Sequence, residues 1–244
     1  MFCLIFGMIS LGLFNLLNFY KLGIECFKGK SLWRTLSNFK LSELKVFGDL
    51  LDAGSKDISS SYYRYLDSSK VKSYTFVDYY SNKNEEILKI DLEKKIPIIS
   101  CSYDSIILMN VLEHVYNFKL LFKELFRITR PGGLLIGAVP FIFRYHADPN
   151  DFYRFTHTCL HRNLVESGYE DIDIHTIGNG LLIVLAEHIT RYIPSHKIFV
   201  FLRLSIWYLS ITLSKISLFN KEDINFNKDQ SIYLGLVFKG KKRK

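Results

Sequence analysis

The sequence predicts an α/β fold with a doubly wound, mostly parallel seven-stranded sheet and a helical insertion before the last strand. Short apolar, strand-like runs alternate with stretches of helical periodicity, which is typical of parallel strands joined by crossover helices. Several of these runs end in a polar residue. Hydrophobic residues make up 48% of the 244 positions, enough for one sizeable core and too many for a disordered chain.

The strand-like runs have a regular order along the chain. We expect strands over residues 44–54, 74–80, 85–93, 102–110 and 134–140, a sixth after Gly168, and a last strand over 231–240 at an edge of the sheet. Between the fourth and fifth strands, Phe118, Leu121, Phe122, Leu125 and Ile128 recur at helical spacing. Pro131-Gly132-Gly133 is expected to stop that helix before the fifth strand begins.

These runs suggest four parts of the chain. Residues 1–45 form an apolar and basic helical segment, and residues 46–178 form the core of the fold. Residues 179–220 form the helical insertion, which could face a membrane, and residues 221–244 hold the final strand and a basic tail.

The net charge of +8 is concentrated at the two ends of the chain. The last six residues contribute +5 and residues 1–45 contribute +4, so residues 46–238 sum to −1. A near-neutral body argues against a nucleic-acid groove, and we expect no nucleic-acid partner. Basic ends beside apolar segments instead suit an anionic membrane surface.

Two apolar segments admit more than one interpretation. Residues 2–20 carry no charged side chain and are just long enough to span a membrane, but they equally suit a helix packed on the domain or lying in the interface. A secretory signal fits poorly, because no basic region precedes the run and no small-residue cleavage site follows it. For residues 198–219 we favour packing or interfacial attachment, because Arg203 and Lys215 interrupt the apolar run.

The four cysteines show neither CxxC spacing nor a metal-ligand spacing to the histidines. We therefore expect reduced thiols and no bound metal. The expected location is the cytoplasm, with attachment to the inner face of the membrane as an extension of that expectation.

Polar residues at the strand ends are the candidates for ligand binding, because a doubly wound sheet binds its ligand outside the carboxyl ends of its strands. At the first strand, Gly54 lets the backbone approach a ligand closely. The alternative for each aspartate is a helix cap or a turn. The candidates are Asp52, Gly54, Ser55, Asp78, Asp91, Leu92 and Asn110.

Two longer motifs carry a family resemblance. YDSIILMNVLEHV followed by ELFRITRPGGLLIGAVP, with DAGS and Asp78 before them, resembles the type-11 methyltransferase domain of the class I S-adenosylmethionine-dependent methyltransferases. The segment YHADPNDFYRFTHTCLHRNLVESGYE resembles a branch often linked to cell-surface glycan biosynthesis. The resemblance covers residues 50–170, about half of the chain.

The resemblance implies a Rossmann-like sheet, bound S-adenosyl-L-methionine and methyl transfer by direct displacement. It assigns Asp52, Gly54 and Ser55 to the methionine side of the cofactor and Asp78 to the ribose. It assigns Asp91 and Leu92 to the adenine, and Asn110 to the pocket floor. One departure is that Gly54 is followed by Ser-Lys-Asp-Ile-Ser, with no second glycine, which could narrow the cofactor pocket.

The residues after the fourth and fifth strands are the candidates for chemistry. His146 is a candidate general base, with hydrogen bonding to a neighbouring aspartate as the alternative, and His114 is the second catalytic candidate. Arg154 could clamp an anionic group of the acceptor or pair with Asp151. The candidates for acceptor binding are Glu113, Asp151, Tyr153 and Arg154.

Two functions of different classes remain at this stage. The first is a methyltransferase acting on a sugar, a lipid-linked glycan or another small acceptor at the cytoplasmic membrane face. The second is a membrane-associated structural protein that keeps the fold but has lost turnover, which the altered glycine loop suggests. An NAD-dependent oxidoreductase is disfavoured, because no GxGxxG follows the first strand.

Overall fold

A computed structural model describes residues 23–55, 57–80, 87–190 and 232–244, together with residues 198, 201, 202 and 205. It divides into two compact units, Met1–Leu36 with Gly178–Tyr233 and Ser37–Ile177 with Leu234–Lys244. The four predicted parts of the chain stay a prediction. Residues 2–20 and most of residues 198–219, the two apolar segments, lie outside the described part. Among the described residues, no helix is both long and apolar enough to cross a membrane.

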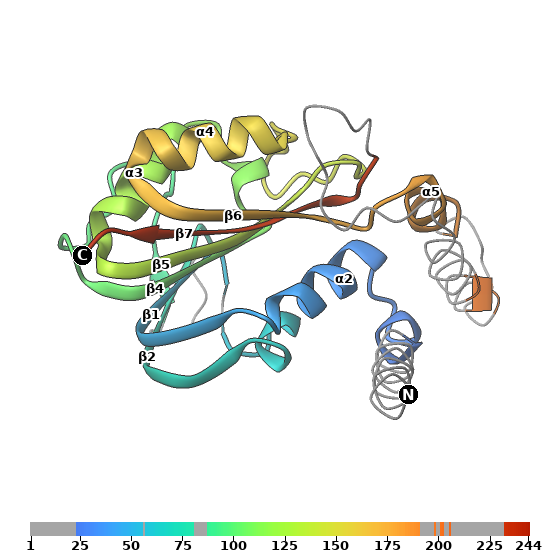
Figure 1. Cartoon of the computed structure of the whole chain (residues 1–244), viewed down its shortest axis with the longest axis horizontal. Coiled ribbons are helices and arrows are strands. Elements are labelled where there is room, and N and C mark those ends of the chain that lie inside the picture. The colour runs from blue at the N-terminus through green and yellow to red at the C-terminus, as the bar shows by residue number, and fades with distance from the viewer. Residues whose placement is uncertain are drawn as a thin grey trace, which may run out of the picture. The chain divides into compact units, whose positions relative to one another are not determined.

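The second unit is built on a seven-stranded sheet with the order β3-β2-β1-β4-β5-β7-β6 (Figure 1). All neighbours are parallel except β7, which runs antiparallel to both β5 and β6. The predicted fold class is thereby confirmed. The strands are β1 (Lys45–Ala53), β2 (Asp67–Asp78), β3 (Ile87–Lys89), β4 (Tyr103–Met109), β5 (Thr129–Pro140), β6 (Tyr169–Ile177) and β7 (Gly235–Lys242).

The position of β7 differs from the prediction, which placed the last strand at an edge. Here β7 lies between β5 and β6, with Leu135 opposite Gly240 on one side and Ile174 opposite Phe238 on the other. Leu236, Val237 and Phe238 are all buried, and because consecutive side chains of a strand point to opposite faces, both faces of β7 are covered there. The apolar run predicts a strand, but both a buried edge and an interior position give such a run.

Helices α3 (Phe118–Ile128) and α4 (His157–Ser167) lie on one face of this sheet (Figure 1). The helical spacing predicted for residues 118–128 is confirmed, because Leu121, Phe122, Leu125 and Ile128 are fully buried. Thr156 caps α4 by accepting a hydrogen bond from the Cys159 backbone N–H, and Gly168 ends it at φ +101°.

The Pro-Gly-Gly segment has a different role from the predicted one. Helix α3 ends at Ile128, before the proline, and β5 already begins at Thr129. The register of β4 against β5 jumps from Tyr103 opposite Thr129 to Ser105 opposite Leu134, so residues 130–133 form an irregular start to the strand. Proline and glycine suit such a bulge, because an irregular ladder does not need every backbone N–H.

The connection between the parallel strands β1 and β2 has little regular structure for a parallel crossover. Within its described residues it contains the short helix η1 (Ser61–Arg64) and no α-helix. The side chains of this connection consequently lie close to the end of β1.

Helix α5 (Leu181–Ile189) belongs to the other unit, which is described by itself. The buried Glu187 of this helix accepts a hydrogen bond from the backbone N–H of Leu32 at 2.7 Å. Leu32 is the first residue of α2 (Leu32–Leu41), so this carboxylate satisfies one of the N–H groups that a helix start leaves unpaired.

Candidate functional site

The carboxyl ends of the parallel strands meet at one edge of the sheet. Asp52 of β1 is opposite Phe76 of β2 and Ile107 of β4, and the Asp78 carbonyl at the end of β2 accepts a hydrogen bond from the Ile90 backbone N–H. The sheet order reverses between β1 and β4, so this edge holds the switch point at which doubly wound sheets bind ligands.

Asp52 is engaged by the protein itself. Its Oδ2 accepts hydrogen bonds from the hydroxyls of Tyr62 at 2.5 Å and Tyr63 at 2.6 Å, and the residue is 1% exposed. Burial raises the pKa of Asp52 to about 6, against the lowering effect of the two hydroxyls. Its contact with a cofactor stays a prediction, and the bonds that the structure shows are internal.

The loop after Asp52 is closely packed as well. Gly54 has φ +104°, and a Cβ on it would lie 2.3 Å from Cγ2 of Val111, so only glycine fits here. The hydroxyl of Ser55 donates to the Asp57 carbonyl and lies 2.9 Å from that of Ser60. Gly54 therefore lets the end of β1 approach the chain after β4, and Ser55 stabilises its own turn.

Asp78 and Asp91 lie at the β2 and β3 end of the edge. One oxygen of Asp78 accepts the Tyr80 backbone N–H at 2.7 Å, and one of Asp91 accepts that of Glu93 at 3.0 Å. Partial burial tends to raise the pKa of Asp91. The Glu93 backbone N–H and the Lys94 ammonium outweigh it and hold this pKa below its usual range. Leu92, next in the chain, is buried. Both aspartates begin tight turns at strand ends, as the alternative interpretation predicts.

The chain leaves β4 through a strained residue. Asn110 has φ +55°, a left-handed conformation in which asparagine is enriched, and its backbone N–H donates to the Ala138 carbonyl. This bend leads directly into the short helix η2 (Leu112–His114), which carries Glu113 and His114.

Glu113 is the most unusual polar group of the described chain. It is 0% exposed, and neither carboxylate oxygen has a hydrogen-bond partner. Its Oε1 lies 3.7 Å from Nε2 of His114 and 3.7 Å from Nε2 of His146. Those separations are too long for hydrogen bonds, and an unpartnered buried carboxylate costs several kcal/mol.

Both histidines are oriented by a contact of Nδ1, the ring nitrogen that does not face Glu113. Nδ1 of His114 lies 2.5 Å from the Asn150 carbonyl oxygen, and Nδ1 of His146 lies 3.0 Å from that of Arg144. A carbonyl only accepts, so each Nδ1 carries the proton and each Nε2 faces Glu113. The neighbouring Glu113 carboxylate raises the pKa of His146, against the lowering effect of partial burial.

Residues 146–154 form a strap that is tied to η2. The Glu113 backbone carbonyl accepts hydrogen bonds from the N–H groups of Phe152 and Tyr153. The Tyr153 hydroxyl donates to the Tyr116 carbonyl at 3.2 Å. Residues 37 to 40 positions apart in the sequence are therefore held side by side.

Asp151 and Arg154 stabilise the strap from within. The guanidinium binds both carboxylate oxygens, with Nη1 to Oδ1 at 2.5 Å and Nη2 to Oδ2 at 2.7 Å, and Asp151 also accepts the His146 backbone N–H. Arg154 lowers the pKa of Asp151 to about 2, although partial burial opposes the shift. The structure thus shows the internal pair that was the alternative to an acceptor clamp.

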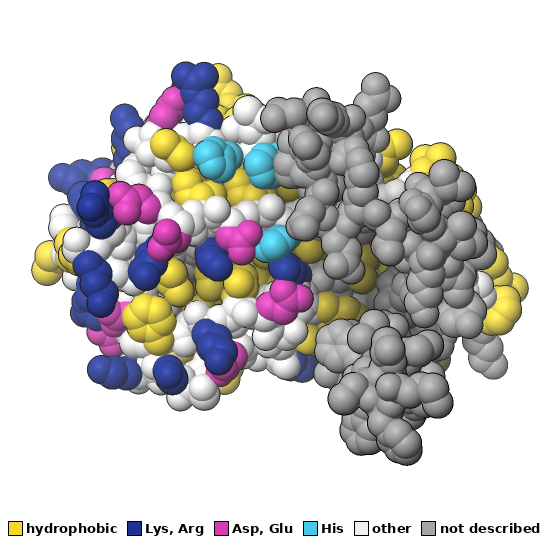
Figure 2. Space-filling model, in the orientation of Figure 1, with side chains coloured by type: hydrophobic (Ala, Val, Ile, Leu, Met, Phe, Trp, Pro, Cys, Tyr) yellow, Lys and Arg dark blue, Asp and Glu magenta, His cyan; other side chains and the backbone are white. Residues whose placement is uncertain are grey.

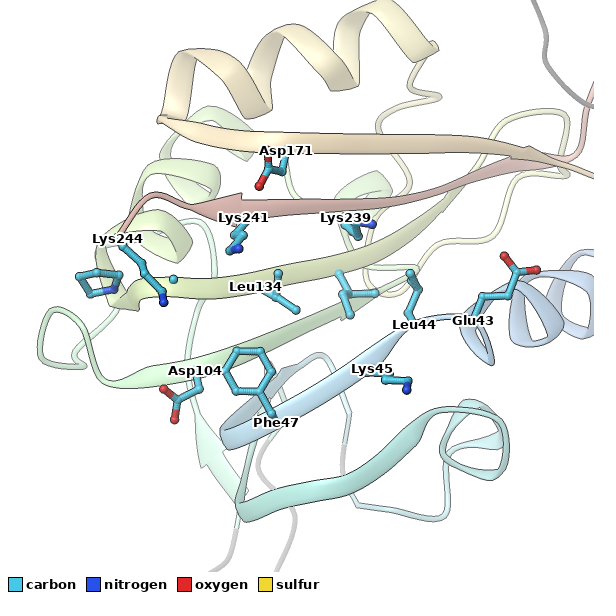
Figure 3. Close-up of a pocket in the computed structure, with 13 residues that line it drawn as sticks. Glu43, Leu44, Lys45, Phe47, Asp104, Leu134, Asp171, Lys239, Lys241 and Lys244 are labelled. Atoms are coloured by element: carbon cyan, nitrogen blue, oxygen red, sulfur yellow. The ribbon is translucent and has the colours of Figure 1, made fainter.

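A separate hollow of about 650 Å³ lies over a face of the sheet, toward the starts of its parallel strands (Figure 3). It is lined by the starts of β1, β4 and β5 and by the end of β7, including Phe47, Leu134, Lys239 and Lys241. Figure 2 shows hydrophobic side chains interspersed with charged ones of both signs on the molecule's face. Because it lies away from the carboxyl ends of the strands, the hollow is not the candidate site.

Two residues of the site are not among the sequence candidates. Tyr62 and Tyr63 both donate hydrogen bonds to Asp52. The only sequence signal for the tyrosines is their polar and aromatic character soon after the first strand. No spacing rule links them to Asp52, because the loop between them sets the contact.

Comparison with known proteins supports the fold. Residues 58–137, about a third of the chain, match the model of a methyltransferase domain. That range includes Asp78, Asp91, Asn110 and Glu113, and excludes Asp52 and the strap. No curated protein matches the chain.

Two solved structures share the fold at low identity. One is Haemonchus contortus phosphoethanolamine N-methyltransferase 2 in complex with S-adenosyl-L-methionine, with a TM-score of 0.51 and 14% identity over 85% of this chain and 52% of that one. The chain therefore spans about half the length of that enzyme. The other is a chain from the complex between the Haloferax volcanii Trm112 methyltransferase activator and its candidate methyltransferase, with a TM-score of 0.52 and 13% identity over 92% of this chain and 98% of that one.

The strand order, the switch point and these comparisons agree with one another. The chain therefore has the Rossmann-like methyltransferase fold, and its methyltransferase domain match lies in the part of the fold that supplies most of the strand-end residues.

Proposed function

We propose that this chain is an S-adenosyl-L-methionine-dependent methyltransferase. The observation that carries the proposal is that the segment matching a methyltransferase domain contributes Asp78, Asp91 and Asn110 to one sheet edge. Two carboxylates at the ends of neighbouring strands suit the hydroxyl and amino groups of a nucleoside. The Haemonchus enzyme, which has the same fold, is itself bound to this cofactor.

We propose that the β1 end contacts the cofactor through its backbone rather than through its side chains. Gly54 keeps the loop free of a Cβ, whereas Asp52 and Ser55 are engaged by Tyr62, Tyr63 and the turn itself. We propose that Asp78 binds the ribose, and that Asp91 and Leu92 contact the adenine. In this assignment Asp52 and Ser55 support the methionine side by shaping the loop, and Asn110 forms the pocket floor.

The bound cofactor would supply an electrophilic methyl group on a sulfonium. The protein's task is then to align an acceptor and remove its proton. We propose that His146 Nε2, or His114 Nε2 beside it, accepts the proton of an acceptor hydroxyl. Glu113 would stabilise the resulting imidazolium from 3.7 Å, and the internal bonds of Asp151 and Arg154 would keep His146 in place.

The proposed acceptor is a small molecule, with a sugar or lipid-linked glycan as the class that the strap suits best. Three exposed aromatic residues lie close to the two histidines in the sequence: Tyr116, Tyr145 and Phe152. The ring centres of Tyr116 and Phe152 lie 5.3 Å apart. Aromatic faces beside hydroxyl-binding groups are suited to a ring that is apolar on one side and polar at its rim. Comparing surface glycans of a deletion strain by mass spectrometry, for the loss of one methyl mass, would identify such an acceptor.

Cofactor binding is the direct test of the enzymatic proposal. Isothermal titration of the full chain with S-adenosyl-L-methionine should show one site, and Asp78→Ala should weaken it at least about tenfold, the effect of losing charged hydrogen bonds. Asp67→Ala is the matched control, because Asp67 lies at the opposite end of the same strand. The proposal fails if the wild-type chain does not bind, or if both variants bind equally well.

We also propose a cytoplasmic location with attachment to the membrane face through the basic ends. Lys242 is committed to the fold, since its ammonium donates to the Phe126 and Thr129 carbonyls, but Arg243 and Lys244 are exposed. Flotation with anionic vesicles should therefore weaken in the double variant Arg243→Ala and Lys244→Ala, and neutral vesicles should bind neither protein. Equal flotation of both proteins would argue against this attachment.

The second candidate is a methyltransferase-fold protein with a structural role at the membrane and no turnover. The observation that favours it is the occupation of Asp52 by Tyr62 and Tyr63 beside a loop with no second glycine. Cofactor affinity together with no methylated product in the cell would support this candidate over the enzyme.

A further inference from the structure

We propose that Glu113, His114 and His146 form a binding site for a transition-metal dication such as Zn²⁺, Co²⁺ or Fe²⁺. This departs from the expectation of no metal, which rested largely on the cysteines. The metal site itself does not depend on methyl transfer.

The three ligand atoms already converge. Each of the three side chains offers one atom, and all three atoms lie within 4.8 Å of one another. Both carboxylate-to-imidazole separations are 3.7 Å. Ligands about 2.1 Å from a tetrahedral ion are roughly 3.4 Å apart, so a small rotation of the rings closes the site.

The electrostatics of the metal-free cluster call for a cation. Because each Nδ1 proton is directed at a carbonyl, a neutral His114 and a neutral His146 both present an Nε2 lone pair to Glu113. The Glu113 carboxylate is fully buried and has no donor. A divalent ion would satisfy all three groups at once, and a doubly protonated imidazole is the rival way to supply positive charge.

The surroundings match what metal-binding histidines require. Such histidines donate their second ring N–H to a carbonyl or carboxylate, which fixes the tautomer and the ring orientation. His114 uses the Asn150 carbonyl, and His146 uses the Arg144 carbonyl with the Asp151 carboxylate 3.3 Å away. The hydrogen bond from the Phe152 N–H to the Glu113 carbonyl holds the two parts of the site together.

The ligand set indicates the class of metal. Imidazole favours zinc and its first-row neighbours over Mg²⁺ and Ca²⁺, which prefer oxygen ligands. Two histidines and one carboxylate leave at least one coordination position open. If the proposed function holds, a bound metal would replace the histidine base proposed above: the open position would bind the acceptor oxygen and make its proton easier to remove, and both histidines would act as ligands.

Metal titration of the untagged, full-length, chelator-treated chain tests the site. We expect one Co²⁺ per chain with visible d–d absorption, displaced by Zn²⁺. Because outer-shell changes alone typically cost 10- to 100-fold in affinity, His146→Ala and Glu113→Gln should each weaken binding by about 100-fold or more.

His157 and His161 provide the matched control. They lie one turn apart on α4 with ring centres 6.1 Å apart, so they are the alternative imidazole pair for a surface-bound ion. The double variant His157→Ala and His161→Ala should keep full affinity and the same spectrum. Circular dichroism would verify the fold of each variant, and His146→Ala serves if Glu113→Gln does not fold, because His146 is partly exposed.

The results separate this inference from the proposed function. The metal site is refuted if the folded wild-type chain binds no stoichiometric Co²⁺ or Zn²⁺ at neutral pH, or if only the α4 double variant loses binding. Asp78→Ala should lose cofactor affinity but keep the metal. A chain that binds metal but no S-adenosyl-L-methionine would contradict the methyltransferase proposal alone.

Discussion

Asp52 and Glu113 are both buried carboxylates at the same edge of one sheet, but they differ in their partners. Asp52 receives two tyrosine hydroxyls, whereas Glu113 receives no donor and faces two imidazole nitrogens. Native proteins pair nearly all buried polar groups, so an unpaired one calls for an explanation. The comparison indicates that the carboxylate at the β1 end is closed off by internal contacts, whereas the carboxylate after β4 lacks a partner, which the proposed metal would supply.

The strap should show the largest effect on stability. Arg154→Met keeps most of the aliphatic stem but leaves the buried Asp151 without its cation, which should cost about 3 kcal/mol of unfolding free energy at neutral pH. Arg162→Met, which removes an exposed pair with Glu166, should cost less than about 0.5 kcal/mol. Urea denaturation would measure both variants.

The same pair has a defined pH dependence. The folded pKa of Asp151 is lowered to about 2 by Arg154, with burial opposing, so the pair's stabilisation is present above about pH 4 and is lost toward pH 2. The deficit of Arg154→Met should shrink over that window. A deficit independent of pH would mean that packing, rather than the ion pair, stabilises the strap.

The second prediction tests the close packing at the β1 end. Gly54→Ala should destabilise the protein by about 2 kcal/mol, because the new methyl overlaps Val111 and φ is positive. Adding Val111→Ala should relieve the overlap and leave the backbone strain, so the two changes should be non-additive in a double-mutant cycle. Additive effects would contradict the contact.

The third prediction concerns the buried carboxylate of β1. Burial raises the pKa of Asp52 to about 6, so its ionisation costs stability as the pH rises from about 4 to 6. Asp52→Asn removes that cost and should raise stability by about 2 kcal/mol at pH 7, with the gain vanishing near pH 4.

Asp49→Asn is the matched control on the same strand. Hydrogen bonds from Ser73 and Arg130 lower the pKa of Asp49, so this substitution should lower stability at pH 7 rather than raise it. Thermal unfolding across pH would compare the two variants. If both substitutions changed the stability at pH 7 in the same direction, burial would not be what sets the pKa of Asp52.

The smallest expected effect belongs to His146 in the metal-free protein. Glu113 raises its folded pKa, so protonated His146 stabilises the fold below the unfolded pKa, and this contribution disappears as the pH rises through the folded pKa. With chelator present, His146→Gln should be less stable than the wild type at pH 5.5 by under about 1 kcal/mol, since His146 is partly exposed. Above that folded pKa, denaturant midpoints should show no electrostatic difference.

The residue pattern determined the fold class and predicted that the polar strand ends meet at one edge of the sheet. Alternating apolar runs, the helical spacing of Leu121, Phe122 and Leu125, and polar strand ends are local properties of the chain, and the structure confirms the fold that they predict. The pattern also placed His114, His146 and Glu113 among the candidates for the site, and the structure brings these three side chains together, while their role stays a prediction. Their mutual distances depend on the strap and could not be read from spacing.

Tertiary structure alone decided the partners of each charged group and the place of the last strand. Tyr62 reaches Asp52, and His146 reaches Glu113, through contacts between segments whose separation follows no periodicity. Likewise, an apolar strand has two hydrogen-bonding sides, and only the gap between β5 and β6 fixes where β7 pairs. Sequence periodicity reports which face of an element is buried, whereas long-range packing sets what that face meets.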